Sequence, residues 1–428
     1  MVKHFFQLTS LNILSNITVP LTGLVDLIVL GHLPNTNALA GISLATILFD
    51  YLYWSLGFFR MGTTGQTAIA YGAGKIEECN FILYRSVLLA LSLGLVILLI
   101  SPIYKFLGFE LLSGEQAVKI AGKEYFESRI WAAPVVLANF TIIGWLLGKG
   151  KSQYVLILTI VANITNILLD YVLVLKWNLA AQGAGVATAC SQYVMFFLSF
   201  IFTHHRGRGN PIDWQKIFIW KKCLEILTFN RDIFLRTLSL LVAFGTFRNL
   251  SSVLGKTTLV SNAILLQFML ISAYLVDGTA FATESIAGNL KGSNNLRQML
   301  SLRNLALQTG ILFNTLFILL LLGFAQTFLS LIVSDENIIL YSKEFLYWLA
   351  PVLISGTFAF IYDGIFAGLT EGKQLRNSMF FSTFLIFLPA ALIGWYQKSN
   401  HILWFAMFLY MLARALSLHY YYHKLKLE

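Results

Sequence analysis

Residues 16–31 read NITVPLTGLVDLIVLG, and this stretch indicates the fold class. With the apolar residues before it, it forms a run from about residue 5 to residue 31. About 20 apolar residues are enough to cross a hydrocarbon core of roughly 30 Å. The stretch nevertheless contains Asp26, and an ionised side chain near the middle of a membrane costs about 2.5–3.5 kcal/mol. Asp26 therefore has a function inside the membrane, or it lies close enough to the edge, beside His32, to reach water.

The composition of the whole chain favours a membrane protein. Of the 428 residues, 57% are hydrophobic and only 12% are charged, and the mean hydropathy is +0.73. A soluble protein has about 25% charged residues, so most of this surface faces lipid. The 30 Lys and Arg outnumber the 20 Asp and Glu, but the basic residues sit in short loops between apolar runs, which is typical of topology signals rather than of a nucleic-acid partner. Three widely spaced cysteines indicate neither a disulfide framework nor a metal site.

Apolar runs of membrane-spanning length follow one another along the chain. The twelve runs cover approximately residues 5–31, 37–60, 82–106, 124–147, 153–177, 183–204, 229–254, 259–286, 303–327, 344–369, 376–396 and 401–422. The first run has no small-residue cleavage site before a polar domain, so we expect a retained helix rather than a signal peptide. The sequence therefore predicts an all-α membrane protein with an N-terminal six-helix lobe (1–205), a linker loop (206–228) and a C-terminal six-helix lobe (229–428).

The distribution of basic residues predicts the orientation. Loops on one side of the predicted membrane are richer in Lys and Arg, and they include Lys3, Lys75, Lys149, Lys151, the linker loop, Lys291, Arg297, Arg303, Lys373, Arg376, Lys424 and Lys426. Loops on the other side carry fewer basic residues, several of them balanced by acids. Because cytoplasmic loops carry the excess of Lys and Arg, we expect both termini and the linker loop to be cytoplasmic.

The two halves of the sequence resemble each other. Residues 61–72 (MGTTGQTAIAYG) align with residues 277–288 (DGTAFATESIAG), and Ala133-Pro134 aligns with Ala350-Pro351 in the same order. A parallel repeat of six spans implies two lobes related by an axis along the membrane normal, with the substrate path between them.

A polar stripe on the fifth run is the second candidate for chemistry after Asp26. Asn163, Asn166 and Asp170 share one helix face. Two amides and a carboxylate on one stripe suit the binding of a proton or a sodium ion, whereas the alternative is a set of interhelical hydrogen bonds.

Further polar residues on the first run can line the same cavity. Asn12 and Asn16 stand about one turn apart and are equally compatible with packing. Pro20 removes a backbone hydrogen bond shortly before Asp26 and is the expected hinge of this helix.

The second half contains its own acids inside apolar runs. Asp277, Glu284 and Asp363 can bind coupling ions, or they can pair with Arg236, Arg248 or Arg414, which also lie in or near apolar runs. Buried acids with arginines nearby are more often structural ion pairs, so pairing is the favoured interpretation.

Aromatic residues are abundant, and motifs of soluble enzymes are absent from the sequence. The chain has 35 Phe, 18 Tyr and 9 Trp. Tyr53 and Trp145 can line a cavity for a lipophilic cation through ring stacking, although membrane anchoring explains most aromatic residues. We find no phosphate loop, no hydrolase elbow and no zinc motif. We therefore expect no cofactor, no metal and no enzymatic activity, and we expect an ion gradient to supply the energy.

Several segments together resemble the multidrug and toxic compound extrusion (MATE) family, in its DinF-like branch. They are residues 16–33, Phe59–Gly65, Asn139–Gly148, Leu227–Arg236, Tyr362–Gly368 and Arg376–Ser378. The resemblance extends from about residue 5 to about residue 420. It implies twelve helices in two six-helix lobes with a V shape. It also implies efflux of lipophilic cations in exchange for protons or sodium ions.

The resemblance assigns roles to particular residues. It implies that Asp26 is the main ion site of the N-terminal lobe and that Asn166 and Asp170 complete it. In the NorM branch, acids of the C-terminal lobe form cation sites, and Glu284 and Asp363 are the candidates here by location. Many members carry a proline earlier in the first helix, where residues 10–12 of this chain read SLN. A hinge is therefore expected nearer Pro20.

These observations lead to one main hypothesis and one alternative. The main hypothesis is a secondary multidrug antiporter, monomeric, in the bacterial plasma (inner) membrane. It exports small lipophilic cations by alternating access, and protons are favoured over sodium ions as the coupling ion. The alternative is a lipid-linked oligosaccharide flippase of the same superfamily, which would favour a strongly cationic cavity.

Overall fold

The computed structural model describes the backbone of residues 1–31, 36–204 and 220–425, with their side chains except at 19–31, 36, 204, 220–223 and 225. These segments form helices joined by short turns, with no strand within those ranges. A helix satisfies its own backbone hydrogen bonds, as lipid requires. Eleven helices in the described part are long and apolar enough to cross a membrane, and the 30-residue helix α1 (Val2–Gly31) precedes them. The all-α membrane fold is therefore confirmed, with eleven candidate spans in the described part and α1 at the position of the first predicted span.

The chain forms two compact units, and each is described here by itself. One unit comprises Leu14–Leu227, and the other comprises Met1–Ile13 together with Thr228–Glu428. We call them the N-terminal lobe and the C-terminal lobe. Helix α1 therefore gives its first residues to the C-terminal lobe and the rest to the N-terminal lobe, an exchange that the predicted boundary at 1–205 does not include. The predicted linker at 206–228 falls largely outside the described residues.

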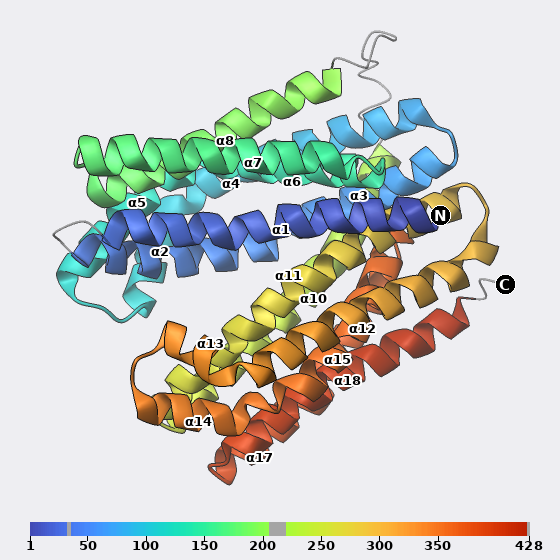
Figure 1. The fold of residues 1–428 in the computed structure, drawn as a ribbon. Coiled ribbons are helices and arrows are strands. Elements are labelled where there is room, and N and C mark those ends of the chain that lie inside the picture. Colours follow the sequence, from blue (N-terminus) through green and yellow to red (C-terminus); the bar gives the residue numbers. More distant parts are fainter. Residues whose placement is uncertain (32–35, 205–219, 426–428) are drawn as a thin grey trace. The chain divides into compact units, whose positions relative to one another are not determined.

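The N-terminal lobe continues from α1 through five further spans, drawn in blue to green in Figure 1. Its elements are α2 (Thr36–Ser55), α3 (Phe58–Gly72), α4 (Ile76–Leu111), α5 (Gln116–Arg129), η1 (Ile130–Ala132), α6 (Ala133–Gly148), α7 (Ser152–Asp170), the π-helical turn η2 (Tyr171–Lys176) and α8 (Ala180–His204). Three of these spans consist of two or more consecutive elements: α2 with α3, α5 with α6, and α7 with η2.

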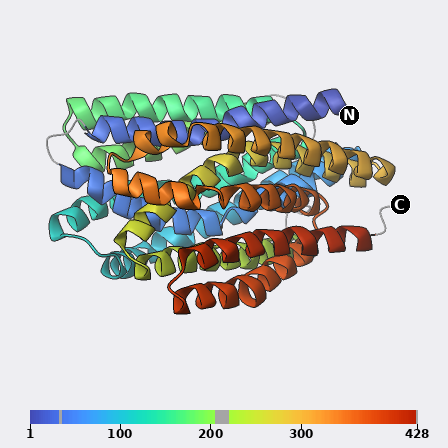
Figure 2. The same cartoon turned by 60° about the horizontal axis from the view of Figure 1, so that its bottom comes forward.

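The C-terminal lobe repeats this plan. Its elements are α10 (Trp220–Val253), α11 (Lys256–Gly292), η3 (Leu296–Gln298), α12 (Met299–Gly323), α13 (Ala325–Ile332), α14 (Glu336–Leu346), α15 (Leu349–Gly368), α16 (Gly372–Phe380), the π-helical turn η4 (Phe381–Phe387), α17 (Leu388–Tyr396) and α18 (Asn400–Lys424). Figure 2 shows its last helices, in red, running side by side.

The turns give direct evidence for the internal repeat. Each of three turns in the N-terminal lobe has a residue with positive φ, and each has a partner in the C-terminal lobe at the same separation along the chain. The pairs are Gly74 and Asn294, Gly150 and Thr370, and Asn178 and Lys398. The same separation relates the first residues of α2 and α11, of α5 and α14, of α7 and α16, and of α8 and α18. The two lobes are therefore built to one plan.

This register corrects the alignment made from sequence. The helix 61–72 corresponds to 281–292, not to 277–288. The sequence alignment was therefore displaced by about one helical turn. A displacement of one turn keeps the same helix face, so a segment rich in Gly, Ala and Thr matches almost as well in either register.

Glycines on α6 and α15 set the packing within each lobe. A Cβ on Gly144 would lie 2.4 Å from the backbone oxygen of Arg60 on α3, and one on Gly364 would lie 2.5 Å from that of Ala280 on α11. Real Cβ atoms do not approach so closely, so only glycine permits these helices to meet. This is the small-residue packing expected of membrane helices, and it occurs at equivalent positions of the two lobes.

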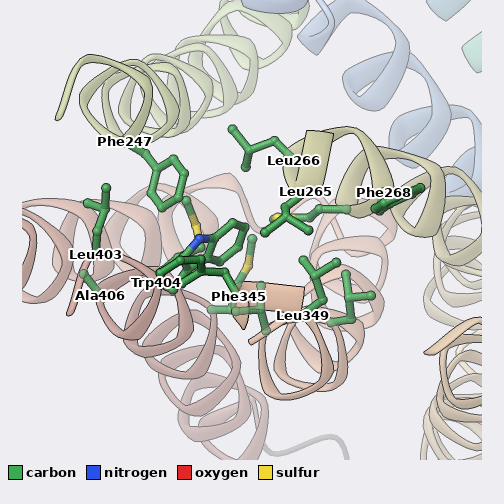
Figure 3. Packing of buried hydrophobic residues seen from close by; sticks show 14 of the residues in the cluster. Phe247, Leu265, Leu266, Phe268, Phe345, Leu349, Leu403, Trp404 and Ala406 are labelled. Carbon is green, nitrogen blue, oxygen red and sulfur yellow. The ribbon is translucent and has the colours of Figure 1, made fainter. Parts of the chain in front are cut away.

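The interior of the C-terminal lobe is a large hydrophobic cluster (Figure 3). Phe247 of α10 packs edge-on against Trp404 of α18, with ring centroids 5.0 Å apart. Leu265 of α11 and Leu349 of α15 are buried in the same cluster. Helices from both ends of the lobe's sequence therefore share one core, which holds α10, α15 and α18 in register with one another.

Candidate ion-coupling site

The predicted polar stripe on α7 is buried within the N-terminal lobe. Asn166 is 4% exposed and Asp170 is 2% exposed. Asp170 is the last residue of α7 before the π-helical turn η2. Such turns interrupt the regular backbone hydrogen bonds and often occur at functional sites. The two buried polar side chains therefore lie next to an irregular part of the span.

The third residue of the stripe joins α7 to α1. The amide of Asn163 donates a hydrogen bond of 3.2 Å to the backbone oxygen of Thr18. Both residues belong to the N-terminal lobe and are partly buried. Asn163 thus fixes the two helices that carry the predicted coupling residues against each other.

Two predicted residues on α1 have side chains outside the described set. Asp26 and Pro20 lie in α1, which continues as a helix through both positions. The predicted contact between Asp26 and Asp170 and the predicted hinge at Pro20 therefore stay predictions.

Asn12 makes a packing contact, one of the two alternatives that the sequence left open. It belongs to the C-terminal lobe, where its amide donates a hydrogen bond of 3.4 Å to the backbone oxygen of Gly278 on α11. The reason is that α1 changes lobe after Ile13. Asn16, one turn later, is half-buried and belongs to the N-terminal lobe. The two asparagines therefore belong to different lobes.

Tyr53 and Trp145 are packed in the interior of the N-terminal lobe. Tyr53 stacks on Phe49, with ring centroids 5.7 Å apart. The indole nitrogen of Trp145 donates a hydrogen bond of 2.9 Å to the backbone oxygen of Cys79. Because each ring fills a buried position between helices, packing accounts for both residues.

The C-terminal lobe contains an ion pair of the predicted kind, in which one acid is shared by two arginines. Oδ2 of Asp363 on α15 accepts hydrogen bonds from Nη2 of Arg236 on α10 and from Nη2 of Arg414 on α18, the latter at 2.6 Å. Pairing, rather than an open ion site, therefore describes Asp363. A carboxylate shared by two guanidinium groups is a strong, charge-assisted arrangement.

A second ion pair on the same helix was missed from the sequence. Oδ1 of Asp232 accepts a hydrogen bond of 2.8 Å from Nη1 of Arg376 on α16. Asp232 lies one turn before Arg236 on α10, so consecutive turns of this helix bind α16 and α15. Asp232 and Arg376 lie in two of the segments that resemble the family, Leu227–Arg236 and Arg376–Ser378, but no spacing along the chain links them.

The other predicted residues of this lobe lie outside the cluster or at its edge. Glu284 on α11 is 1% exposed, and Asp277 on the same helix is half-buried. Arg248 on α10 is exposed, and the ion pairs of Asp363 are made by Arg236 and Arg414 instead. Within the described residues, His, Cys, Asp and Glu form no group of three or more that could hold a metal ion.

Comparison with known proteins identifies the family. A model of the MatE family matches residues 12–172 and 235–393. The chain is 33% identical over 419 residues to DNA damage-inducible protein F of Escherichia coli (strain K12), covering 97% of this chain and 91% of that protein. It is 24% identical over 354 residues to "Probable multidrug resistance protein NorM" of Thermotoga maritima, covering 81% of this chain and 74% of that protein.

Solved structures share the fold. An outward-facing multidrug resistance MATE family transporter of the MOP superfamily matches with a TM-score of 0.90 and 19% identity, covering 99% of this chain and 95% of that one. A MOP superfamily transporter from Pyrococcus furiosus matches with a TM-score of 0.90 and 18% identity, again covering 99% and 95%. With the two-lobed helical fold and the match to the family model, the chain belongs to the MatE family of multi-pass membrane transporters and is not an enzyme.

Proposed function

We propose that this transporter is a secondary antiporter that exports small lipophilic, mostly cationic molecules in exchange for protons. Coupling takes place in the N-terminal lobe, at a site formed by Asp26, Asn166 and Asp170. The observation that carries the proposal is the burial of Asp170 and Asn166 on α7, a helix whose Asn163 binds the backbone of α1 at Thr18. Burial of an ionisable acid inside a membrane protein is energetically costly, and such acids commonly take part in proton or ion exchange.

The geometry of α1 and α7 supports a shared site. As the first and fifth spans, they run in the same direction across the membrane. From the contact between Thr18 and Asn163, Asp26 lies about 12 Å further along α1, and Asp170 lies about 10 Å further along α7, at 1.5 Å per residue. The two acids therefore stand at nearly the same level of two adjacent helices.

Proton binding at this site would shift the equilibrium between the inward-facing and outward-facing conformations of the transporter. Two carboxylates at one level of a lobe repel each other, and a proton taken up from outside removes that repulsion. A cationic substrate is held less well by a neutralised site and is released. A ligand shifts a conformational equilibrium only through its different affinity for the two states. Here the proton and the substrate favour opposite states, which is the requirement for antiport.

The test is transport in proteoliposomes with an imposed pH gradient or sodium gradient, applied separately. We expect the pH gradient to drive accumulation of a fluorescent lipophilic cation and Asp26→Asn to abolish it. Asp335→Asn, which changes an exposed helix-capping acid of α14, is the matched control and keeps transport. Full gradient-driven transport by a correctly inserted Asp26→Asn protein would contradict the proposal. Transport of an anionic lipid carrier instead of the cation would favour the flippase alternative.

A further inference from the structure

The C-terminal lobe holds a buried ion cluster that the proposed coupling site does not use. Arg236 of α10 and Arg414 of α18 both donate hydrogen bonds to one oxygen, Oδ2, of Asp363 on α15. The side chains of Arg236, Asp363 and Arg414 are 11%, 8% and 1% exposed. The single carboxylate thus lies between two cations that belong to the protein itself and arrive from two different helices.

Arg414 is fixed in this position by contacts beyond the acid. Its guanidinium carbon lies 5.4 Å from the ring centre of Phe360 and 5.5 Å from that of Tyr410. Its Nη1 donates to Sδ of Met411 at 3.4 Å. A guanidinium group keeps its charge at every physiological pH. Arg414 is therefore a permanent cation enclosed by aromatic rings, and a change of pH does not release it.

Arg236 is positioned by the neighbouring turn of α10. Asp232, one turn earlier, accepts the hydrogen bond from Arg376 and so binds α10 to α16. The two ion pairs form consecutive steps along α10. Within the described residues, the buried Nε of Arg236 has no acceptor, so its bond to Asp363 is the polar contact that holds its guanidinium group.

We propose that Arg236 and Arg414 are tethered counter-cations of Asp363. This acid then exchanges neither a proton nor a sodium ion during transport, and every coupling ion is taken up in the N-terminal lobe. The inference rests on the antiport function proposed above and excludes Asp363 from its coupling ions.

Charge and geometry together prevent exchange at Asp363. Protonation of Asp363 would leave two buried guanidinium groups without the carboxylate that they share, and breaking a buried pair in this way is strongly unfavourable. A sodium ion would have to bind among oxygen ligands at a point already occupied by guanidinium N–H groups. The other titratable groups facing the cluster are Asp277 on α11, which acts on Arg414, and Tyr410 on α18. Asp277 adds a negative charge that helps to retain Arg414.

The test is infrared difference spectroscopy of the purified protein between about pH 5 and about pH 9, the range in which a coupling acid titrates. A protonated carboxyl group gives a carbonyl band that its ionised form lacks. The difference between spectra recorded at two pH values therefore shows which carboxyl groups titrate. We expect Asp170→Asn to remove a titrating band from the wild-type spectrum and Asp363→Asn to remove none. In Arg236→Met/Arg414→Met, a new titrating band appears, and adding Asp363→Asn removes it. Arg236→Lys, which keeps a tethered cation, shows no new band.

Binding of radioactive sodium to the same preparations gives a second measurement. We expect no sodium binding that depends on Asp363 in the wild-type protein. Loss of a titrating band, or of sodium binding, in Asp363→Asn would overturn the inference, as would a folded double arginine variant without a new band. Should that variant fail to fold, the comparison of wild-type protein with Asp363→Asn still decides. Because these readouts need no transport, failure of gradient-driven export in proteoliposomes would count against the proposed function and not against this inference.

Discussion

In the N-terminal lobe the buried acid Asp170 follows the buried amide Asn166 on α7, whereas in the C-terminal lobe the buried acid Asp363 lies between Arg236 and Arg414. The lobes share their helix starts, their positive-φ turns and their close helix contacts at glycine. At the separation that relates those turns, Asp170 corresponds to Ala390 and Asn166 to Ile386. The repeat therefore preserves the packing and not the polar groups.

The reverse comparison gives the same result. Arg236, Asp363 and Arg414 correspond to Asn16, Ile143 and Val194 of the N-terminal lobe, none of which is charged. Contacts that depend on backbone approach cannot change without loss of the fold, because a Cβ at Gly144 or Gly364 has no room. Buried charges are free to differ between the lobes as long as each is compensated locally. Two copies of one fold can therefore differ in function. In our proposals, the N-terminal lobe exchanges the coupling ion and the C-terminal lobe keeps its buried charges fixed.

Neutralising the acid of the C-terminal lobe is expected to have the largest effect on stability. Asp363→Asn leaves Arg236 and Arg414 buried without a counter-ion, which costs about 3–5 kcal/mol. Replacing all three residues with Met removes the charges together and should restore most of the loss, since apolar substitutes for buried ion networks are often neutral. Thermal unfolding in detergent measures both. Equal stability of Asp363→Asn and the wild-type protein would show that the cluster does not compensate charge as described.

The glycine contacts test the part of the comparison in which the lobes agree. Gly144→Ala and Gly364→Ala each place a Cβ within 2.5 Å of a backbone oxygen, so both should lower stability by about 1–3 kcal/mol, as overpacking does. Gly245→Ala on α10 is the matched control, because nothing lies within 4 Å of its Cβ. A helical alanine there should be neutral or should stabilise by up to about 1 kcal/mol. A large loss in only one lobe would contradict equivalent packing.

A smaller effect is expected at the contact between α1 and α7. Asn163→Ala removes the hydrogen bond to Thr18 and should cost about 1 kcal/mol of stability. Because it loosens the two helices that carry the coupling acids, it should also reduce proton-driven export by about fivefold. Asn12→Ala removes a comparable bond to Gly278 in the C-terminal lobe and should leave the export unchanged. Transport assays at matched protein density distinguish the two, and an equal reduction in both variants would place Asn12 back at the coupling site.

Much of the fold could be predicted from the sequence because lipid permits few solutions. Runs of apolar residues such as 82–106 have to become helices in lipid, and the distribution of Lys and Arg predicts their orientation. The exchange of α1 between the lobes could not be predicted, because nothing in the pattern around Ile13 and Leu14 marks a boundary. It depends on which lobe offers a close contact, here Gly278 against Ile13.

The polar residues were predicted less evenly. The stripe of Asn163, Asn166 and Asp170 followed from helical periodicity, and burial of its last two members agrees with it. Pairing was the favoured interpretation for the acids of this lobe, with Arg236 and Arg414 among the candidate partners, but the shared Asp363 joins residues of three different helices. No spacing rule reaches across such distances, so only the packed lobe reveals it.

The central claim is that coupling resides in the N-terminal lobe alone. The direct measurement is export driven by a pH gradient in proteoliposomes, with Asp170→Asn compared against the charge-free variant Asp363→Met/Arg236→Met/Arg414→Met. We predict that Asp170→Asn lowers export by about tenfold or more, whereas the charge-free variant stays within about twofold of the wild-type protein. Normal export by Asp170→Asn together with lost export in a folded charge-free variant would contradict the account.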